Sequence, residues 1–120
     1  MKVFNTPDAC MDVCFNEGNG NQILSSSGDG TISLWDLTLP DNSPPVQMVK
    51  AHEAEVNSVA WNHINGKTIV TASNDMKVNV WDATTLATGQ PVASFAHEFT
   101  VYQAMWHPTH DSIIGSCSGD

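Results

Sequence analysis

The sequence predicts an all-β fold built from repeated four-stranded antiparallel sheets. Three observations predict it: an internal repeat, an alternation of apolar and polar residues inside each repeat, and turn-forming residues between the alternating segments. The 120 residues are 41% hydrophobic and 14% charged, which is typical of a globular domain rather than a disordered chain. Apolar runs are only a few residues long, so we expect no direct insertion into a membrane.

The repeat becomes visible when the chain is aligned with itself. A shift of 46 positions superimposes the same residue types without a gap, and a second shift of 45 positions does so again further along the chain. Recurrence at a fixed spacing of this length is the signature of a repeat architecture. The first shift aligns Ser27 with Ser73, Asp29 with Asp75 and Trp35-Asp36 with Trp81-Asp82; the second aligns His52 with His97, Trp61 with Trp106 and Ser73 with Ser118.

Within each repeat the pattern predicts strands separated by tight turns. Ile32 and Leu34 alternate with polar neighbours, as do Val78 and Val80 one repeat later. Turn residues lie between the strands, because glycine and asparagine adopt the backbone conformations that hairpins need. The turns are expected at Gly18-Asn19-Gly20, Asn65-Gly66 and Ser27-Gly28-Asp29-Gly30, with a longer loop from Asp41 to Pro45.

The repeat resembles the WD repeat. It carries a histidine, then a Ser-x-Asp turn, and then Trp-Asp at the end of a third strand. Such repeats are the blades of a β-propeller, so the resemblance implies a partial WD40-type β-propeller of about two and a half blades. We expect full blades at 6–37 and 52–83 and a partial blade at 97–120. Because a blade buries its faces only against neighbours, this fragment of a ring should expose an apolar face at each end and an unpaired strand edge at Asp120, and should self-associate.

The WD-repeat resemblance also implies a hydrogen-bonded network inside each blade. In such blades a histidine, a serine, the turn aspartate and the third-strand tryptophan are linked. The first repeat carries Thr6 where the histidine is expected, which predicts a weaker network there. The residues implied are His52, Ser73, Asp75 and Trp81 in the second blade, Ser27, Asp29 and Trp35 in the first, and His97 in the third.

The net charge of the chain indicates which kinds of partner it can bind. Four Lys and Arg residues against thirteen Asp and Glu give a net charge of -9, which repels nucleic acid and anionic membrane surfaces and favours a cationic peptide or protein. The first residues lack the apolar segment of a secretory signal, so we expect a cytoplasmic protein. The three cysteines show no disulfide framework spacing and are expected to be reduced, with Cys10 and Cys14 buried as small apolar residues.

Several longer stretches are similar to the receptor family for the type 2 peroxisomal targeting signal. The chain departs from that family where Phe15 replaces a usual tryptophan, where Asn74 replaces a frequent tryptophan before the turn aspartate, and where Met76 replaces a common glycine. The similar stretches are Phe4-Asn5-Thr6-Pro7-Asp8 with Met11 to Glu17, Leu34-Trp35-Asp36-Leu37, Lys50 to Asn62, and Val101 to Pro108 with Ser116 to Asp120.

This resemblance implies a function and a site. The family binds N-terminal targeting helices that carry arginine and an apolar side, acts with an import co-receptor, and shuttles between the cytoplasm and the peroxisome. By resemblance, Asp8 and Glu55 match positions that meet basic side chains of the signal, because carboxylates form strong charge-assisted hydrogen bonds with guanidinium. Tyr102 could offer its ring to an apolar residue of the signal.

Three alternatives stay open at this point. Asp8, Glu55 and Tyr102 could be ordinary rim residues, and the chain could be a general WD-repeat scaffold in a multiprotein complex. An enzyme is the third alternative: Gly115 to Gly119, centred on Cys117, imitates a nucleophile elbow, but the repeat places Cys117 on a strand that no helix follows. We expect no cofactor and no metal, since His63, His107 and His110 lack a matching ligand cluster.

Overall fold

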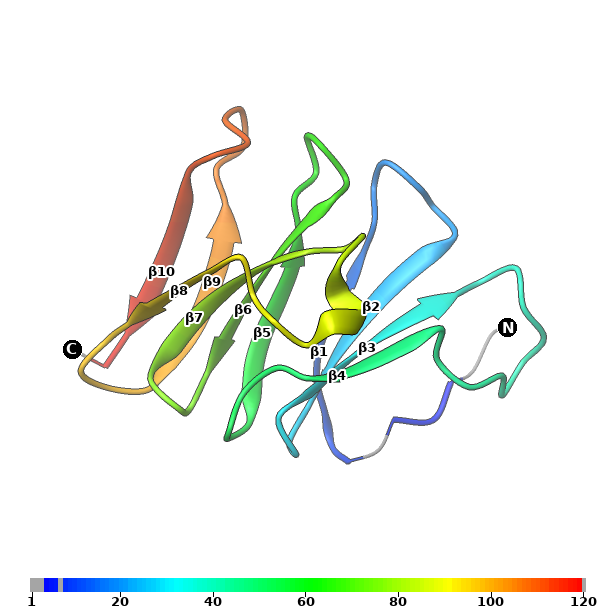
Figure 1. The fold of residues 1–120 in the computed structure, drawn as a ribbon, viewed down its shortest axis with the longest axis horizontal. Coiled ribbons are helices and arrows are strands. Elements are labelled where there is room, and N and C mark those ends of the chain that lie inside the picture. Colours follow the sequence, from blue (N-terminus) through cyan, green and yellow to red (C-terminus); the bar gives the residue numbers. More distant parts are fainter. Residues whose placement is uncertain (1–3, 7, 120) are drawn as a thin grey trace.

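The computed structural model describes residues 4–6 and 8–119. The described chain folds into three antiparallel sheets that stand side by side (Figure 1). Its elements are β1 (Cys10–Phe15), β2 (Gln22–Ser27), β3 (Thr31–Asp36), β4 (Gln47–Lys50), β5 (Val56–Trp61), β6 (Thr68–Ser73), β7 (Lys77–Asp82), the short 3₁₀ helix η1 (Leu86–Thr88), β8 (Ala93–Ala96), β9 (Val101–Trp106) and β10 (Ile114–Ser118).

The sheets follow the chain order without a crossover. The first pairs β1-β2-β3-β4, the second pairs β5-β6-β7-β8, and the third contains β9 and β10. We call these sheets the first, second and third blades. The predicted units at 6–37 and 52–83 end before the outer strands β4 and β8, so the four-stranded sheets extend past those boundaries.

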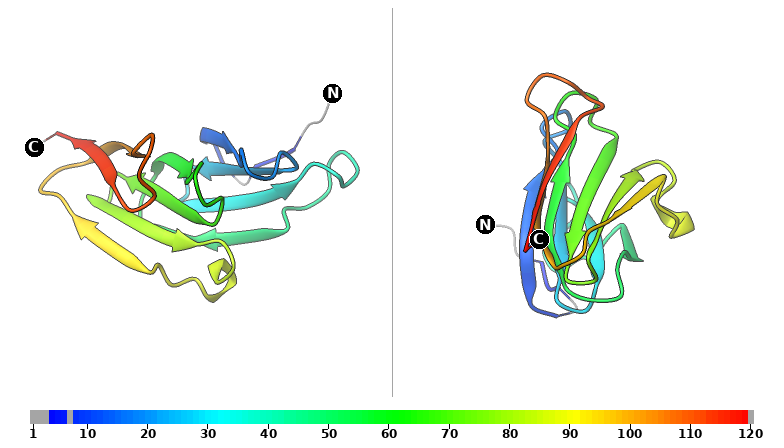
Figure 2. Two further views of the ribbon diagram at one scale, coloured as in Figure 1. Left: turned by 90° about the horizontal axis from the view of Figure 1, so that it is seen from above. Right: turned by 90° about the vertical axis from the view of Figure 1, so that its left-hand side faces the viewer.

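The blades fan out from their first strands. β1, β5 and β9 lie on one side of the molecule, and the outer strands β4 and β8 lie on the other (Figure 2). These three inner strands run in the same direction and are joined by side chains rather than by a main-chain ladder. The Asp12 carboxylate accepts the Val59 N–H at 3.1 Å, and the Ser58 hydroxyl lies 3.3 Å from the Ala104 carbonyl oxygen.

The core consists of the apolar surfaces that the blades press against each other. One cluster lies between the first and second blades and includes Leu24, Ile32 and Trp61. A second cluster lies between the second and third blades and includes Val70 and Val101. Strand residues two apart share a face, so alternating apolar positions give each sheet two faces that adjacent blades can cover.

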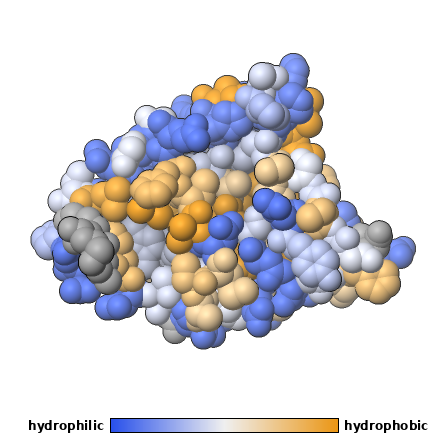
Figure 3. Space-filling view, turned by 180° about the vertical axis from the view of Figure 1, so that it is seen from behind, coloured by the Kyte–Doolittle hydropathy of each residue, from blue (hydrophilic) through white to orange (hydrophobic). Residues whose placement is uncertain are grey.

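The outward faces of the first and third blades carry exposed apolar side chains. Val13 and Phe15 on β1 are 55% and 57% exposed, and Met105 on β9 is 55% exposed. Val13 and Phe15 line a shallow groove together with Trp35. Viewed from behind, apolar residues form an orange band across the side on which the inner strands lie (Figure 3). β10 is an edge strand of its sheet, and Asp120, where we expected an unpaired edge, lies outside the described residues.

The aspartate of each Trp-Asp pair holds the turn that follows its strand. The Asp36 carboxylate accepts the Thr38 N–H at 2.8 Å and the Thr38 hydroxyl at 2.6 Å. Asp82 accepts the same two groups of Thr84 at the same distances. These hydrogen bonds lower the pKa of both carboxyl groups, since they stabilise the ionised form.

Candidate functional site at the lower edge

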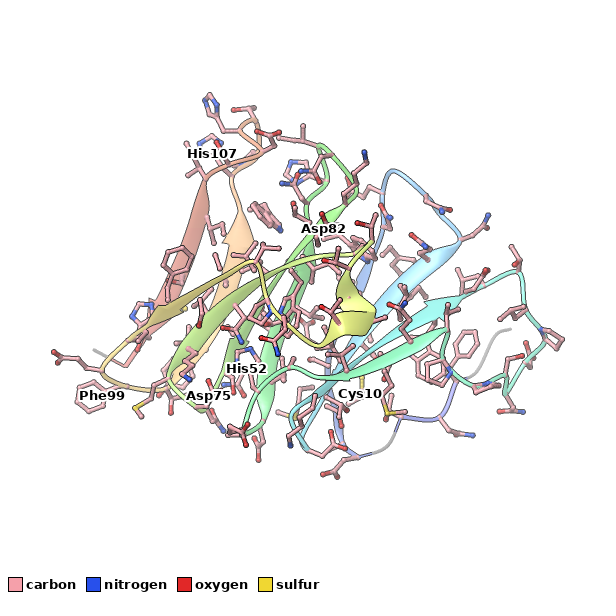
Figure 4. The ribbon with its side chains drawn as sticks, viewed as in Figure 1. Cys10, His52, Asp75, Asp82, Phe99 and His107 are labelled. Carbon is pink, nitrogen blue, oxygen red and sulfur yellow. The ribbon has the colours of Figure 1, made fainter. Side chains whose placement is uncertain are left out.

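The candidate site lies along one edge of the stacked sheets. We call it the lower edge: the edge, lowermost in Figure 1, at which β1, β5 and β9 begin and at which the turns β2–β3 and β6–β7 lie. His52, Asp75 and Phe99 lie toward this edge, whereas Asp82 and His107 lie toward the opposite, upper edge (Figure 4). Because the inner strands run in the same direction, segments 46 positions apart meet at one edge.

A β-bulge interrupts the pairing at the start of each inner strand. In the second blade Val56 pairs with Ser73 and Ser58 with Ala72, which leaves Asn57 as the extra residue. The corresponding extra residues are Met11 in the first blade and Tyr102 in the third. A bulge redirects a side chain out of the regular alternation. Three bulges at equivalent positions therefore present one side chain per blade along the lower edge.

Glu55 is exposed immediately before β5. Its carboxylate oxygen Oε2 accepts a hydrogen bond at 3.2 Å from the side-chain amide of Asn74, which lies in the β6–β7 turn. The side-chain oxygen of Asn74 in turn accepts a hydrogen bond at 2.7 Å from the side-chain amide of Asn57. The Glu55 carboxylate is thus held by a neighbouring side chain while it faces solvent.

Asp8 is exposed before β1, and its carboxylate accepts the N–H of Ala9 at 2.7 Å. It does not occupy the position that corresponds to Glu55: a shift of 46 positions aligns Glu55 with Ala9 and Asp8 with Ala54. The two carboxylates therefore belong to adjacent blades at the same edge but enter it from loop positions one residue apart.

Tyr102 is 59% exposed in β9, and Phe99 just before this strand is 56% exposed. Both side chains border Gly119, where an added Cβ would lie 3.6 Å from the Tyr102 hydroxyl oxygen and 3.4 Å from the Phe99 Cβ. Exposed aromatic rings at the same edge as carboxylates can contact a ligand that is basic on one side and apolar on another. Phe99 was not among the predicted site residues; its place two residues before an inner strand was the available signal.

The second blade contains a continuous hydrogen-bonded network. His52 Nδ1 lies 2.9 Å from Asp75 Oδ2, and His52 Nε2 lies 2.7 Å from the Thr71 hydroxyl oxygen. The Trp81 indole N–H donates to the same hydroxyl oxygen at 3.0 Å. We assign the histidine proton to Nδ1, since a carboxylate only accepts; Thr71 then donates to Nε2.

Thr71, not Ser73, connects His52 to Trp81 in this network. The Ser73 hydroxyl instead donates to the Glu55 carbonyl oxygen at 2.7 Å and accepts the Asp75 N–H at 3.1 Å. Residues 71 and 73 project from the same face of β6, so the repeat pattern alone could not distinguish them. The predicted serine therefore stabilises the turn and the loop before β5 rather than linking the aromatic rings.

The first blade keeps only part of this network. The Trp35 indole N–H donates to the Ser25 hydroxyl oxygen at 2.8 Å, and Asp29 accepts the N–H and hydroxyl of Thr31 at 3.0 and 2.6 Å. Ser27 is buried at the end of β2. Thr6, which replaces the histidine, donates to the Asp8 carbonyl oxygen.

The third blade contains a histidine–hydroxyl pair that corresponds to His52 and Thr71. His97 Nε2 lies 3.0 Å from the Ser116 hydroxyl oxygen. A shift of 45 positions aligns Ser116 with Thr71, so the hydroxyl partner occupies the same repeat position in all three blades. Asp120, which aligns with Asp75, lies outside the described residues.

Burial controls the protonation of His52. The side chain is fully buried, and loss of solvation lowers its pKa below 6.5 despite the opposing attraction of Asp75. The neutral imidazole is the form whose Nε2 can accept a hydrogen bond from the Thr71 hydroxyl. This placement inside the blade suits a structural hydrogen-bonding role.

The three cysteines differ in burial. Cys117 lies exposed on β10, and Cys10 is also exposed, contrary to our expectation that it would be buried. Cys14 is half-buried, and burial raises the pKa of its thiol.

Across residues 4–6 and 8–119 no three His, Cys, Asp or Glu side chains gather as metal ligands. No helix in these residues has the length and hydropathy to cross a membrane.

Comparison with known proteins gives a family match. The model of the family described as "WD domain, G-beta repeat" matches residues 1–36 and 43–82. These ranges cover the first two blades up to β7 and include both Trp-Asp pairs. The match therefore covers more than half of the chain.

Curated relatives include receptors for the type 2 peroxisomal targeting signal. The human receptor is 34% identical over 106 residues, which cover 88% of this chain and 32% of the receptor. The receptor of Dictyostelium discoideum is 40% identical over 60 residues, which cover 50% of this chain and 19% of that protein. The chain thus spans at most about a third of the length of these relatives.

A solved structure shows the same fold. The β-propeller domain of Cps50 (Swd1) from Myceliophteria thermophila superimposes with a TM-score of 0.80 at 23% sequence identity, covering 95% of this chain and 34% of that one. At this identity the likeness concerns the fold alone. The prediction of an all-β, partial WD40-type β-propeller is confirmed.

Proposed function

The chain belongs to the WD-repeat family, and on that premise we propose that it is part of a receptor that binds the N-terminal type 2 peroxisomal targeting signal of matrix proteins. The function is binding without a catalytic step. The observation that carries the proposal is the 34% identity to the human receptor across 88% of the chain.

The lower edge supports this proposal through its chemistry. Asp8 and Glu55 are exposed carboxylates that can accept hydrogen bonds from an arginine of the signal, and Tyr102 offers an exposed ring at the same edge in the third blade. The net charge of -9 favours a cationic ligand over nucleic acid, because it attracts basic side chains at long range.

The proposal extends to partners and location. The signal would bind as an amphipathic helix with its basic and part of its apolar side on the lower edge, and an import co-receptor would cover its remaining apolar side. The receptor would collect cargo in the cytoplasm and shuttle to the peroxisome. It would require no cofactor.

The test is a charge reversal at the lower edge. We would measure the affinity of a synthetic type 2 signal peptide for the full-length protein and for its Glu55→Lys and Asp8→Lys variants. We expect each variant to bind about ten- to a hundredfold more weakly, the range for losing a hydrogen bond to a charged group. Glu17→Lys, which makes the same charge change in the β1–β2 turn at the upper edge, is the matched control.

Two outcomes would contradict the proposal in different ways. Unchanged affinity in both lower-edge variants would remove the site assignment while leaving the receptor function. A parent protein with no affinity for the signal peptide would favour a general WD-repeat scaffold in a multiprotein complex. That second candidate is supported by the exposed apolar side chains at the lower edge, such as Met11, Met76 and Phe99, which suit many protein partners.

A further inference from the structure

A chain of side-chain amides crosses the boundary between the second and third blades at the lower edge. The Asn57 amide nitrogen lies 2.9 Å from the Val101 carbonyl oxygen and 2.7 Å from Asn74 Oδ1. The Asn74 amide nitrogen lies 3.2 Å from Glu55 Oε2. Glu55 is therefore connected through two asparagines to the first residue of β9.

The direction of these hydrogen bonds is fixed by their two ends. The Val101 carbonyl and the Glu55 carboxylate can only accept, so Asn57 and Asn74 must each direct an amide N–H toward them. Asn57 uses its two amide hydrogens for Val101 and for Asn74, whose oxygen faces Asn57 and whose nitrogen faces Glu55. No other assignment of the two amide groups satisfies all three contacts.

The backbone places Asn57 where it can reach both blades. Asn57 is the extra residue of the β5 bulge, and Tyr102, directly after Val101, is the extra residue of the β9 bulge. A bulge turns its residue away from the regular strand alternation, here toward the adjacent blade. The amide chain thus ties the Glu55 carboxylate to the backbone that carries the Tyr102 ring.

This arrangement is specific to the second blade. The positions of Glu55, Asn57 and Asn74 are occupied in the first blade by residues without an amide or a carboxylate, and the same holds in the third blade. The equivalents are Ala9, Met11 and Gly28 in the first blade and Thr100, Tyr102 and Gly119 in the third.

We propose that Asn57 and Asn74 are positioning residues that hold Glu55 ready for the guanidinium of a bound peptide and set its distance from Tyr102. The inference rests on the proposed function. A free glutamate loses rotamer freedom when it binds a ligand, and ordering it beforehand reduces that loss. A carboxylate accepts several hydrogen bonds, so the contact with Asn74 leaves capacity for arginine donors.

The test compares two peptides on the full-length protein. One peptide is a type 2 signal with its arginine, and the other has that arginine replaced by alanine. We expect Asn74→Ala and Asn57→Ala each to weaken binding of the arginine peptide about three- to tenfold, as for one ordinary hydrogen bond. Binding of the alanine peptide should change less than twofold, because Glu55 then has no partner in the ligand.

A double variant adds a readout that a merely structural role would not move. If Asn74 acts through Glu55, Asn74→Ala should cause no further loss in a Glu55→Ala background. Asn21→Ala in the β1–β2 turn at the upper edge is the matched control, and hydrogen exchange of β5 and β6 reports whether the variants keep their fold.

The outcomes separate this inference from the function on which it rests. Equal loss for both peptides, no loss in Asn74→Ala, or additive losses with Glu55→Ala would overturn the positioning role. If Glu55→Ala weakens arginine-peptide binding while both asparagine variants bind normally, only the positioning role fails. A parent protein that binds neither peptide overturns both proposals.

Discussion

The first and second blades both provide a hydrogen-bond acceptor for the buried indole N–H of their third-strand tryptophan, but the network around that acceptor is longer in the second blade. In each, the third-strand tryptophan donates to a hydroxyl ten residues earlier in the chain, Ser25 in one and Thr71 in the other. Only the second blade continues from that hydroxyl to His52 and Asp75. The histidine is thus not needed to satisfy the tryptophan; it ties the loop before β5 to the β6–β7 turn.

This difference bears on the lower edge, because the tied loop leads directly into Glu55. Asp75 also accepts the Glu53 N–H at 3.2 Å, and Ser73 donates to the Glu55 carbonyl oxygen. The loop that carries Glu55 is therefore fixed at several points. In the first blade, Asp8 follows Thr6 without a comparable connection through a histidine to its β2–β3 turn.

The largest expected effect comes from removing the shared hydroxyl in the second blade. Thr71→Val leaves both His52 Nε2 and the Trp81 indole N–H without the hydroxyl that they share, and each buried unsatisfied group costs about 1–3 kcal/mol. We expect a loss of about 2–6 kcal/mol in the stability of this blade. Hydrogen exchange of the full-length protein, which resolves individual blades, is the measurement.

The matched change in the first blade is Ser25→Ala. It removes one hydrogen bond, and Ser25 lines the groove beside Trp35, where water can replace its hydroxyl. The loss should be near the lower end of about 1–3 kcal/mol. Equal losses in the two blades would show that the histidine extension contributes nothing to stability.

A smaller effect is expected from pH in the second blade. The pKa of His52 is lower in the folded protein than its ordinary 6.5, so the unfolded chain binds the proton more readily. The stabilisation is complete above about pH 7 and is lost as the pH falls through the folded-state pKa. Amide exchange in β6 and β7 should accelerate as the pH falls below the ordinary histidine value of 6.5, after correction for intrinsic exchange rates.

The variant His52→Gln separates this titration from other groups. It should remove the pH dependence in this range, because glutamine does not ionise. Carboxylates with lowered pKa values, such as Asp29 and Asp82, lose their contribution only at more acidic pH. An unchanged profile in His52→Gln would assign the effect to another residue.

The smallest expected effect is a gain from restoring the missing histidine. Thr6 and Ser25 line the same groove, so Thr6→His places an imidazole near the equivalent of Thr71. One additional hydrogen bond contributes about 0.5–1.5 kcal/mol to stability. We expect slower exchange in β2 and β3; faster exchange there would indicate that the first blade has no room for the ring.

Much of the lower edge was predictable because the repeat places equivalent residues together. Glu55 and Tyr102 were identified by resemblance to a receptor family, and the structure brings their backbones to one edge. Their role in binding a signal stays a prediction. Asn57 and Asn74 gave no sequence signal as partners of Glu55, because their contacts depend on a bulge and on the spacing of two blades.

The sequence by itself determined the blade type, the first three strands of each full blade and the tryptophans that recur in the repeat, because period and turn chemistry are local properties. Only the tertiary structure decided that Thr71 rather than Ser73 joins His52 to Trp81. Both hydroxyls project from the same face of one strand, about 7 Å apart, and the distance from the His52 ring to each hydroxyl selects between them. Such distances depend on how strands from different parts of the chain pack, which no periodicity encodes.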